Sequence, residues 1–166
     1  MGPTVRFEGT KAFVENVKHV SSSVRDAIEN ASKACGYLVM NDAKALVPVD
    51  TGRLRASLSV NWTGSGKSFG TVSGKVEPSR SGKSKKALSA EDGVGNPESE
   101  YPNGFNVAVG TNVEYAEDVE DTNSPYLWPA YAMNQAKYAA MLTVALKMAI
   151  EIKGGGRASS FFGSPL

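Results

Sequence analysis

Residues 46–60, LVPVDTGRLRASLSV, most constrain the fold of this chain, because a long helical pattern ends there and an alternating pattern begins. Pro48 disfavours the helical conformation in the residue before it. Asp50 and Thr51 have short polar side chains that can bond nearby backbone amides, and Gly52 permits conformations that other residues resist. The stretch therefore predicts a turn that ends a helix and opens a new element.

Apolar and polar residues alternate from Arg53 onward, which is the period of a strand with one buried face. We therefore predict a strand over 53–62, with Arg53 on its exposed side. The residues expected on its buried side are Leu54, Ala56, Leu58 and Val60.

Two long helices are predicted, one before this strand in the sequence and one near the end of the chain. Residues 24–46 follow a segment at 10–20 that also has helical spacing, and the expected apolar stripe of the longer helix is Val24, Ile28, Ala31, Cys35, Leu38 and Ala45/Leu46. A last helix is predicted over about 129–152, with Pro129 suited to its first turn.

The last helix carries two apolar stripes. The main one is Tyr131, Tyr138, Leu142, Ala145, Ala149 and Ile152, and the second is Met133, Ala136, Ala140, Val144 and Met148. A helix that is apolar on two faces needs two surfaces to cover it. We expect the sheet to cover one face and a neighbouring subunit to cover the other.

The remaining regular elements are short. Strands are predicted at 69–76 and 104–110, and an acidic helical turn at 113–120. Residues 62–104 form a long Gly/Ser/Lys-rich insertion, and 153–166 form an irregular tail. We therefore predict one α+β domain over 1–166, in which a small antiparallel sheet is packed by a long N-terminal helical segment and a long C-terminal helix.

Cysteine content and hydropathy favour a protein made in the cytoplasm. The single cysteine has no internal partner for a disulfide, and the longest apolar run is too short for a membrane span. Neither a cofactor nor a metal site is predicted, because the only histidine, His19, has no cysteine or second histidine near it in the sequence.

Charge is strongly separated along the chain although the net charge is only +1. Residues 67–90 have a net charge of +5, and residues 91–121 have nine acidic side chains and no basic one. One interpretation is two solvated loops. The other is a basic end that meets the acidic end of an identical neighbour, through Lys83, Lys85, Lys86, Glu117, Asp118 and Glu120.

Two motifs suggest other functions. Asp50-Thr51-Gly52 is the tripeptide of aspartic proteases, and a retropepsin-like enzyme would use it as a dimer. A capped turn is favoured, because a proline precedes the tripeptide and a basic stretch follows it. Residues 64–68, GSGKS, lack the earlier glycine of a phosphate-binding loop, and a polar loop is favoured there. The basic stretch leaves non-specific DNA binding as a further alternative.

Taken in order, several segments resemble the tail-completion, or minor tail component, family of tailed double-stranded DNA bacteriophages. The residues that carry the resemblance are Pro48, Asp50, Thr51, Gly52, Arg53 and Leu54 at the turn; Val109, Gly110, Tyr115, Ala116, Val119 and Glu120 in the middle; and Leu127, Trp128, Pro129 and Ala130 at the start of the last helix. The resemblance covers about residues 5–152 apart from the insertion.

This resemblance implies a structural virion protein without enzyme activity. It implies a homo-oligomeric ring at the head–tail junction, assembled in the host cytoplasm beside other neck, connector and tail proteins, with the genome passing through it. The candidate subunit interface on the last helix is Met133, Ala140, Val144 and Met148, and no membrane contact is expected.

Overall fold

The computed structural model describes residues 2, 4–8, 22–48, 52–76, 87–99, 104–122 and 124–153. The helical segment predicted at 10–20 lies outside these residues. So do Asp50, Thr51, the three lysines 83, 85 and 86, and the tail after Lys153.

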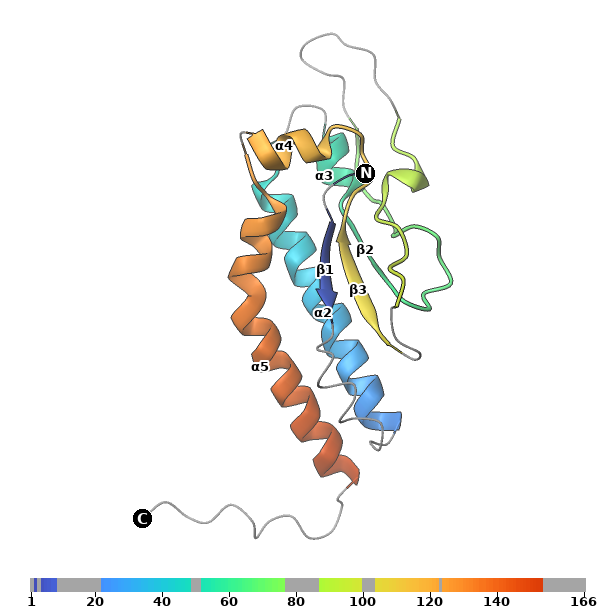
Figure 1. The fold of residues 1–166 in the computed structure, drawn as a ribbon, viewed down its shortest axis with the longest axis vertical. Helices are drawn as coiled ribbons and strands as arrows, with labels where there is room; N and C mark the ends of the chain where they lie inside the picture. The colour runs from blue at the N-terminus through green and yellow to red at the C-terminus, as the bar shows by residue number, and fades with distance from the viewer. Residues whose placement is uncertain are drawn as a thin grey trace, which may run out of the picture.

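A three-stranded antiparallel sheet lies at the centre of the fold, with the strand order β1-β3-β2 (Figure 1). β1 spans Thr4–Glu8, β2 spans Ser59–Trp62 and β3 spans Asn106–Gly110. Val109 of β3 pairs with Val5 on one side and Val60 on the other. The sequence prediction included β3 but missed β1, the first strand of the chain.

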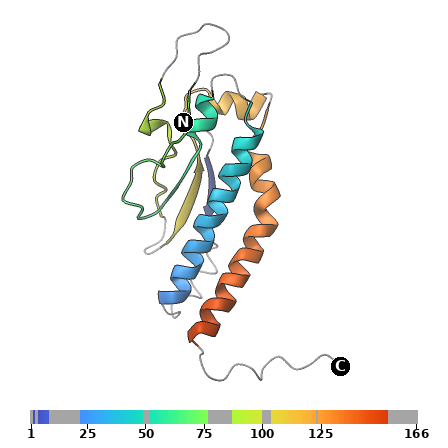
Figure 2. The same ribbon diagram turned by 180° about the vertical axis from the view of Figure 1, so that it is seen from behind.

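Two long helices lie side by side and cover one face of the sheet (Figures 1 and 2). α2 spans Ser22–Leu46 and α5 spans Leu127–Lys153, close to the two long helices predicted. α2 lies against the sheet at Gly36, where an added Cβ would stand 2.8 Å from Val107 Cγ1 and 3.0 Å from Val60 Cγ1. The structure therefore has the predicted α+β architecture.

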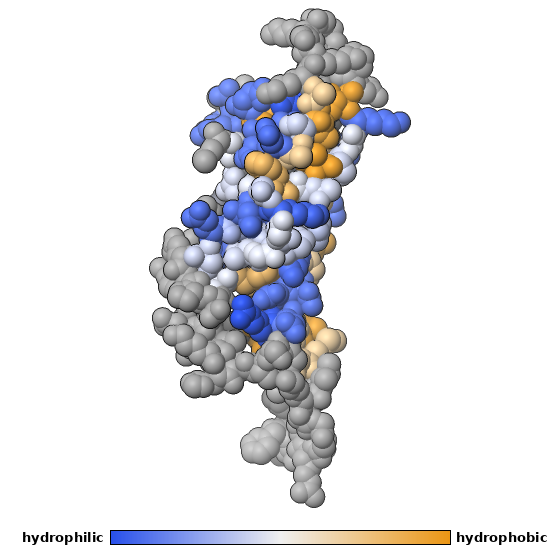
Figure 3. All heavy atoms as spheres, turned by 90° about the vertical axis from the view of Figure 1, so that its right-hand side faces the viewer, coloured by the Kyte–Doolittle hydropathy of each residue, from blue (hydrophilic) through white to orange (hydrophobic). Residues whose placement is uncertain are grey.

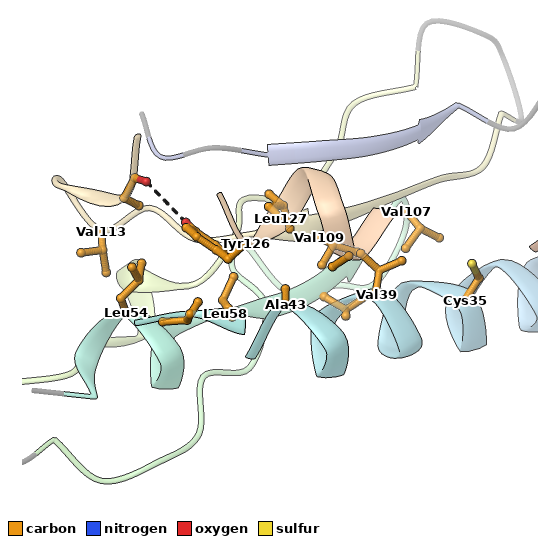
Figure 4. Close-up of a cluster of buried hydrophobic side chains, with 14 residues drawn as sticks. Cys35, Val39, Ala43, Leu54, Leu58, Val107, Val109, Val113, Tyr126 and Leu127 are labelled. Carbon is orange, nitrogen blue, oxygen red and sulfur yellow. Dashed lines mark hydrogen bonds between the residues drawn. The ribbon is translucent and has the colours of Figure 1, made fainter. Parts of the chain in front are cut away.

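The hydrophobic core lies between α2, the sheet and the start of α5 (Figure 4). α2 contributes Cys35, Val39 and Ala43, which recur every four residues along one side of the helix. The predicted stripe was therefore wrong at Leu38 and at Ala45/Leu46, which are exposed, because the buried row continues through Val39, Ala43 and Val47 instead.

The strand predicted over 53–62 was half wrong. Residues Arg53–Ser57 form a short helix, α3, and the strand begins only at Ser59. Gly52 precedes the helix in the left-handed conformation, with φ of 75°. Arg53, expected on an exposed face, is buried, because the helical turn directs both it and Leu54 inward.

The other short elements differ in detail from the prediction. No strand forms over 69–76, where only Phe69 makes an isolated bridge, to Gly95. The acidic helical turn is confirmed as α4, Ala116–Thr122. Within the predicted insertion, a 3-10 turn, η2, spans Ala90–Asp92.

The thiol of Cys35 and the phenolic hydroxyls of two tyrosines, which lose their protons at alkaline pH, are largely buried. Their burial predicts that the protein is less stable at alkaline pH. Burial raises the pKa of Cys35 from its ordinary 9.0 to about 11, and burial also raises the pKa of Tyr126 and Tyr138. Above pH 9 the unfolded chain therefore releases protons that the folded chain retains, and the free energy of unfolding falls as the pH rises.

Urea unfolding followed by circular dichroism, at a series of pH values from about 8 to 11, measures this loss, which we expect to be between about 1 and 3 kcal/mol. Tyr126→Phe removes one of the titrating groups and should flatten the decline above pH of about 10. A free energy of unfolding that stays level across this range would contradict the assignment.

Candidate functional site

α5 carries four of the seven large apolar side chains that are exposed among the described residues. Four large apolar side chains on this helix are exposed: Trp128 at 64%, Met133 at 53%, Val144 at 50% and Met148 at 58%. The other exposed residues between Trp128 and Met148 are four alanines, Ala132, Ala136, Ala139 and Ala140, and four polar residues, Gln135, Lys137, Thr143 and Lys147. A surface helix of a monomeric protein usually places charged residues here.

The inner side of α5 is fixed to α2 by polar contacts. Asn134 is fully buried, and its amide donates hydrogen bonds to Asp42 Oδ2 at 2.6 Å and to the Ala130 carbonyl at 2.8 Å. Lys137 donates to Asn134 Oδ1 at 3.1 Å. The Ser32 and Tyr138 hydroxyls lie 3.4 Å apart. These contacts hold α5 in one rotation, so its outer face is presented in a defined direction.

A groove of about 600 Å³ opens between α2 and the C-terminal half of α5. Ala27, Asn30 and Ala31 line it from α2, and residues 140–149 line it from α5, among them Val144 and Met148. We call this the α2–α5 groove. Three of the four predicted interface residues on α5 therefore lie along it, and Met133 lies outside it, nearer the start of the helix.

The start of α5 is capped by Glu120, at the end of the predicted middle motif. The Glu120 carboxylate accepts hydrogen bonds from the backbone amides of Tyr126, Leu127 and Trp128, at 2.9, 3.0 and 2.8 Å. Pro129, the next residue, has no amide hydrogen to satisfy. The first turn of α5 therefore has a partner for each of its available donors.

Removing this cap tests its contribution to stability. We expect Glu120→Ala to lower the free energy of unfolding by about 1–2 kcal/mol, because three amides at a helix start lose their acceptor. Glu117→Ala, an exposed change on the same short helix, is the matched control and should stay within about 0.5 kcal/mol of the parent. Equal urea midpoints for the two variants would show that water replaces the carboxylate without cost.

Arg53, from the predicted turn motif, forms a buried ion pair within the fold. Its Nη2 lies 2.6 Å from Asp92 Oδ1, with side-chain exposures of 5% and 7%. The same nitrogen lies 3.3 Å from Glu114 Oε2, whose side chain is 59% exposed. Burial opposes the charge on Arg53, but the hydrogen bonds and charges of Asp92 and Glu114 outweigh it and raise the pKa of the guanidinium.

Further contacts fix the segment around Asp92 to the end of β3. The Asp92 carbonyl accepts from Thr111 Oγ1 at 3.0 Å and from the Asn112 amide at 2.9 Å. The Asn112 side chain donates to the Gly93 carbonyl at 2.8 Å. Val94 is buried, so part of the predicted insertion belongs to the packed structure. We call residues 87–99 the anchored segment.

The face that carries the anchored segment lies on the right of Figure 1, away from α5. Viewed from that side, hydrophilic residues cover much of its middle, and hydrophobic residues form separate patches (Figure 3). No local pattern in the sequence marks Asp92, Glu114 or Asn134, since each has its partner in a distant part of the chain.

Other predicted residues stay apart from these features. Glu117 and Asp118 lie exposed on α4, and their proposed contact with the three lysines, which lie outside the described residues, stays a prediction. In the GSGKS stretch, Gly64 and Gly66 adopt positive φ angles in an exposed turn, and no helix follows within 64–76.

The described residues contain no cluster of three or more His, Cys, Asp or Glu side chains that could hold a metal ion. None of the helices in this part of the chain is long and apolar enough to cross a membrane.

Comparison with known proteins supplies the family. Residues 11–121 match the model of the HK97-gp10-like family, described as "Bacteriophage HK97-gp10, putative tail-component". No curated protein and no solved structure matches the chain significantly. The match covers more than half of the chain and includes the turn motif, the β3 motif and Glu120. The chain therefore belongs to the HK97-gp10-like family, and it is a structural tail component of a bacteriophage virion.

Proposed function

We propose that the protein is a tail-completion subunit that forms a closed ring at the head–tail junction of the virion. The observation that carries this proposal is the exposed apolar face of α5. A helix with apolar side chains on two faces requires a second surface to bury them, and within the described residues only one side of α5 is covered.

A ring requires that one patch of each subunit meets a different patch of the next. The outer side of α5 would supply one patch. The exposed acidic residues of α4, Glu117 and Asp118, lie near the start of the same helix and could meet the basic stretch of a neighbour. Exposed ion pairs contribute only about 0–1 kcal/mol each, so charge would set register and association rate, while the apolar contact would supply most of the affinity.

In this role the ring contacts other neck, connector and tail proteins and surrounds the path of the genome. DNA that moves through such a ring is held by non-specific contacts at most, because sequence-reading contacts would hinder its passage. No chemistry is required of the subunit. The function of the subunit is to form a ring of fixed diameter whose upper and lower surfaces bind the adjoining neck, connector and tail proteins.

Electron microscopy of the purified protein tests the proposal directly. Class averages with rotational symmetry, together with labelling of the neck when tagged protein is incorporated into virions, are the expected result. A protein that stays monomeric at all concentrations and labels another part of the tail would overturn it.

A further inference from the structure

The α2–α5 groove has no occupant among the described residues, although nearly all of its lining is apolar. Ala27 and Ala31 form one wall and Met141, Val144 and Met148 form part of the other, and Asn30 is the only polar residue that lines it. Leaving such a surface in water is unfavourable by about 25 cal/mol for each Å² of apolar area. An apolar segment that covered the groove would therefore be stabilised.

We infer that the groove is the docking site of the chain's own C-terminal segment, residues 154–166, which binds through Phe161 and Phe162. The groove lies along the last turns of α5, between residues 140 and 149, and α5 ends at Lys153. The segment that follows starts with Gly154-Gly155-Gly156, which lets the chain reverse direction with little steric cost, and it carries two adjacent aromatic residues.

Chain length permits this docking. Val144 lies nine residues before the end of α5, which is about 14 Å along the helix axis. The eight residues from Lys153 to Phe161 can span up to about 26–29 Å when extended. A tether of only eight residues also holds the aromatic pair at an effective concentration in the millimolar range, so that a weak apolar contact is enough to keep it bound.

The segment before α2 is less suited to this groove. Residues 9–21 connect the end of β1 to the start of α2, so this segment is tied at both ends, and one of these ends, Glu8, lies in the sheet, whereas the groove faces away from the sheet. On α2, Ala27 lines the groove and Gly36 faces the sheet. Successive residues of a helix are rotated by about 100°, so these two residues, nine apart, lie on opposite sides of α2. Residues 154–166 instead follow directly from α5, the helix that lines the groove with residues 140–149.

Disulfide trapping in the full-length chain tests the inference with a matched pair of variants. Ser160→Cys is combined either with Val144→Cys, which lines the groove, or with Thr143→Cys, which is equally near the tail but outside the lining. Positions 143 and 144 are both exposed. The native Cys35 is fully buried and has a pKa raised to about 11, so it should not compete for disulfide formation.

Under mild oxidation of a dilute sample, we expect the intramolecular disulfide to form at least about fivefold faster with Cys at 144 than at 143. Adding Phe161→Ser and Phe162→Ser should remove this difference. Equal rates at the two positions would overturn the inference, as would a difference that survives loss of both aromatic residues or disulfides that form only between chains. The last result would indicate a second copy as the occupant.

This inference concerns the separate subunit and does not rest on the proposed function. The two meet at Ala140, Val144 and Met148, which line the groove and also belong to the predicted interface. A neighbouring subunit that covered these residues would have to displace the segment. Disulfide trapping in dilute solution tests the occupant of the groove, and imaging of rings tests the assembly. A negative result in one experiment therefore leaves the other proposal standing.

Discussion

Asp92→Ala is expected to lower the free energy of unfolding by about 3–5 kcal/mol, a large share of the stability of a domain of this size. Removing the carboxylate takes away the buried partner of the Arg53 guanidinium and leaves the exposed Glu114 as a weaker, solvated one. It also removes the acceptor of the Ser89 amide, which donates to Asp92 Oδ2 at 2.9 Å. Urea unfolding followed by circular dichroism measures the loss.

Glu114→Ala is the matched control for this change, because it removes the other carboxylate from the same guanidinium. Its side chain is 59% exposed, so water can replace it, and we expect a loss below about 1 kcal/mol. The double variant Arg53→Met with Asp92→Leu should recover much of the stability, since no unpaired charge remains buried. Equal losses for Asp92→Ala and Glu114→Ala would show that burial does not strengthen the pair.

Val144→Asp is expected to abolish ring assembly and to leave the subunit folded. Val144 is half exposed among the described residues, and an aspartate there would stay hydrated by releasing the segment inferred to cover it, so the melting temperature of the subunit should change little. In a subunit contact the same carboxylate would be buried without a partner, at a cost on the order of several kcal/mol for each interface. Size-exclusion chromatography with light scattering distinguishes ring from subunit.

Val144→Ile is the control, because it keeps the side chain apolar and should assemble normally. Met148→Asp, one turn further along the same face, should reproduce the defect. Rings of normal size from both aspartate variants would show that this face of α5 stays exposed in the assembly. The apolar contact would then lie elsewhere on the subunit.

The elements that could be predicted from the sequence are those whose pattern is long or whose ends are marked. α2 and α5 each show helical spacing over more than twenty residues, and β3 alternates between Gly104 and Gly110. The two-sided apolar character of α5 could also be predicted, because it depends only on which residues recur at helical spacing. Three members of this second stripe, Met133, Val144 and Met148, are exposed to solvent when only the described residues are considered.

Short patterns failed for a definite reason. Leu54 and Leu58 fit both the period of a strand and the spacing of a helix, and five residues cannot distinguish the two. The core needs only that both leucines face inward, and α3 achieves this while it directs Arg53 toward Asp92. That partner lies 39 residues away inside a stretch that looks like an irregular loop. Pairings of this kind are properties of the tertiary structure and leave no local pattern.

The strand order has a consequence for how the chain folds. β1 is the first strand to leave the ribosome, yet its only partner, β3, begins at residue 106. β2 also pairs with β3, so neither of these strands has its partner in the described sheet until β3 is made, and β1 has the longer loop to close. The entropic cost of closing the longer loop is modest, about 0.6 kcal/mol for each doubling of length, but such long-range pairing slows folding. Translation speed across the first hundred residues should therefore matter less than the time allowed after β3 emerges.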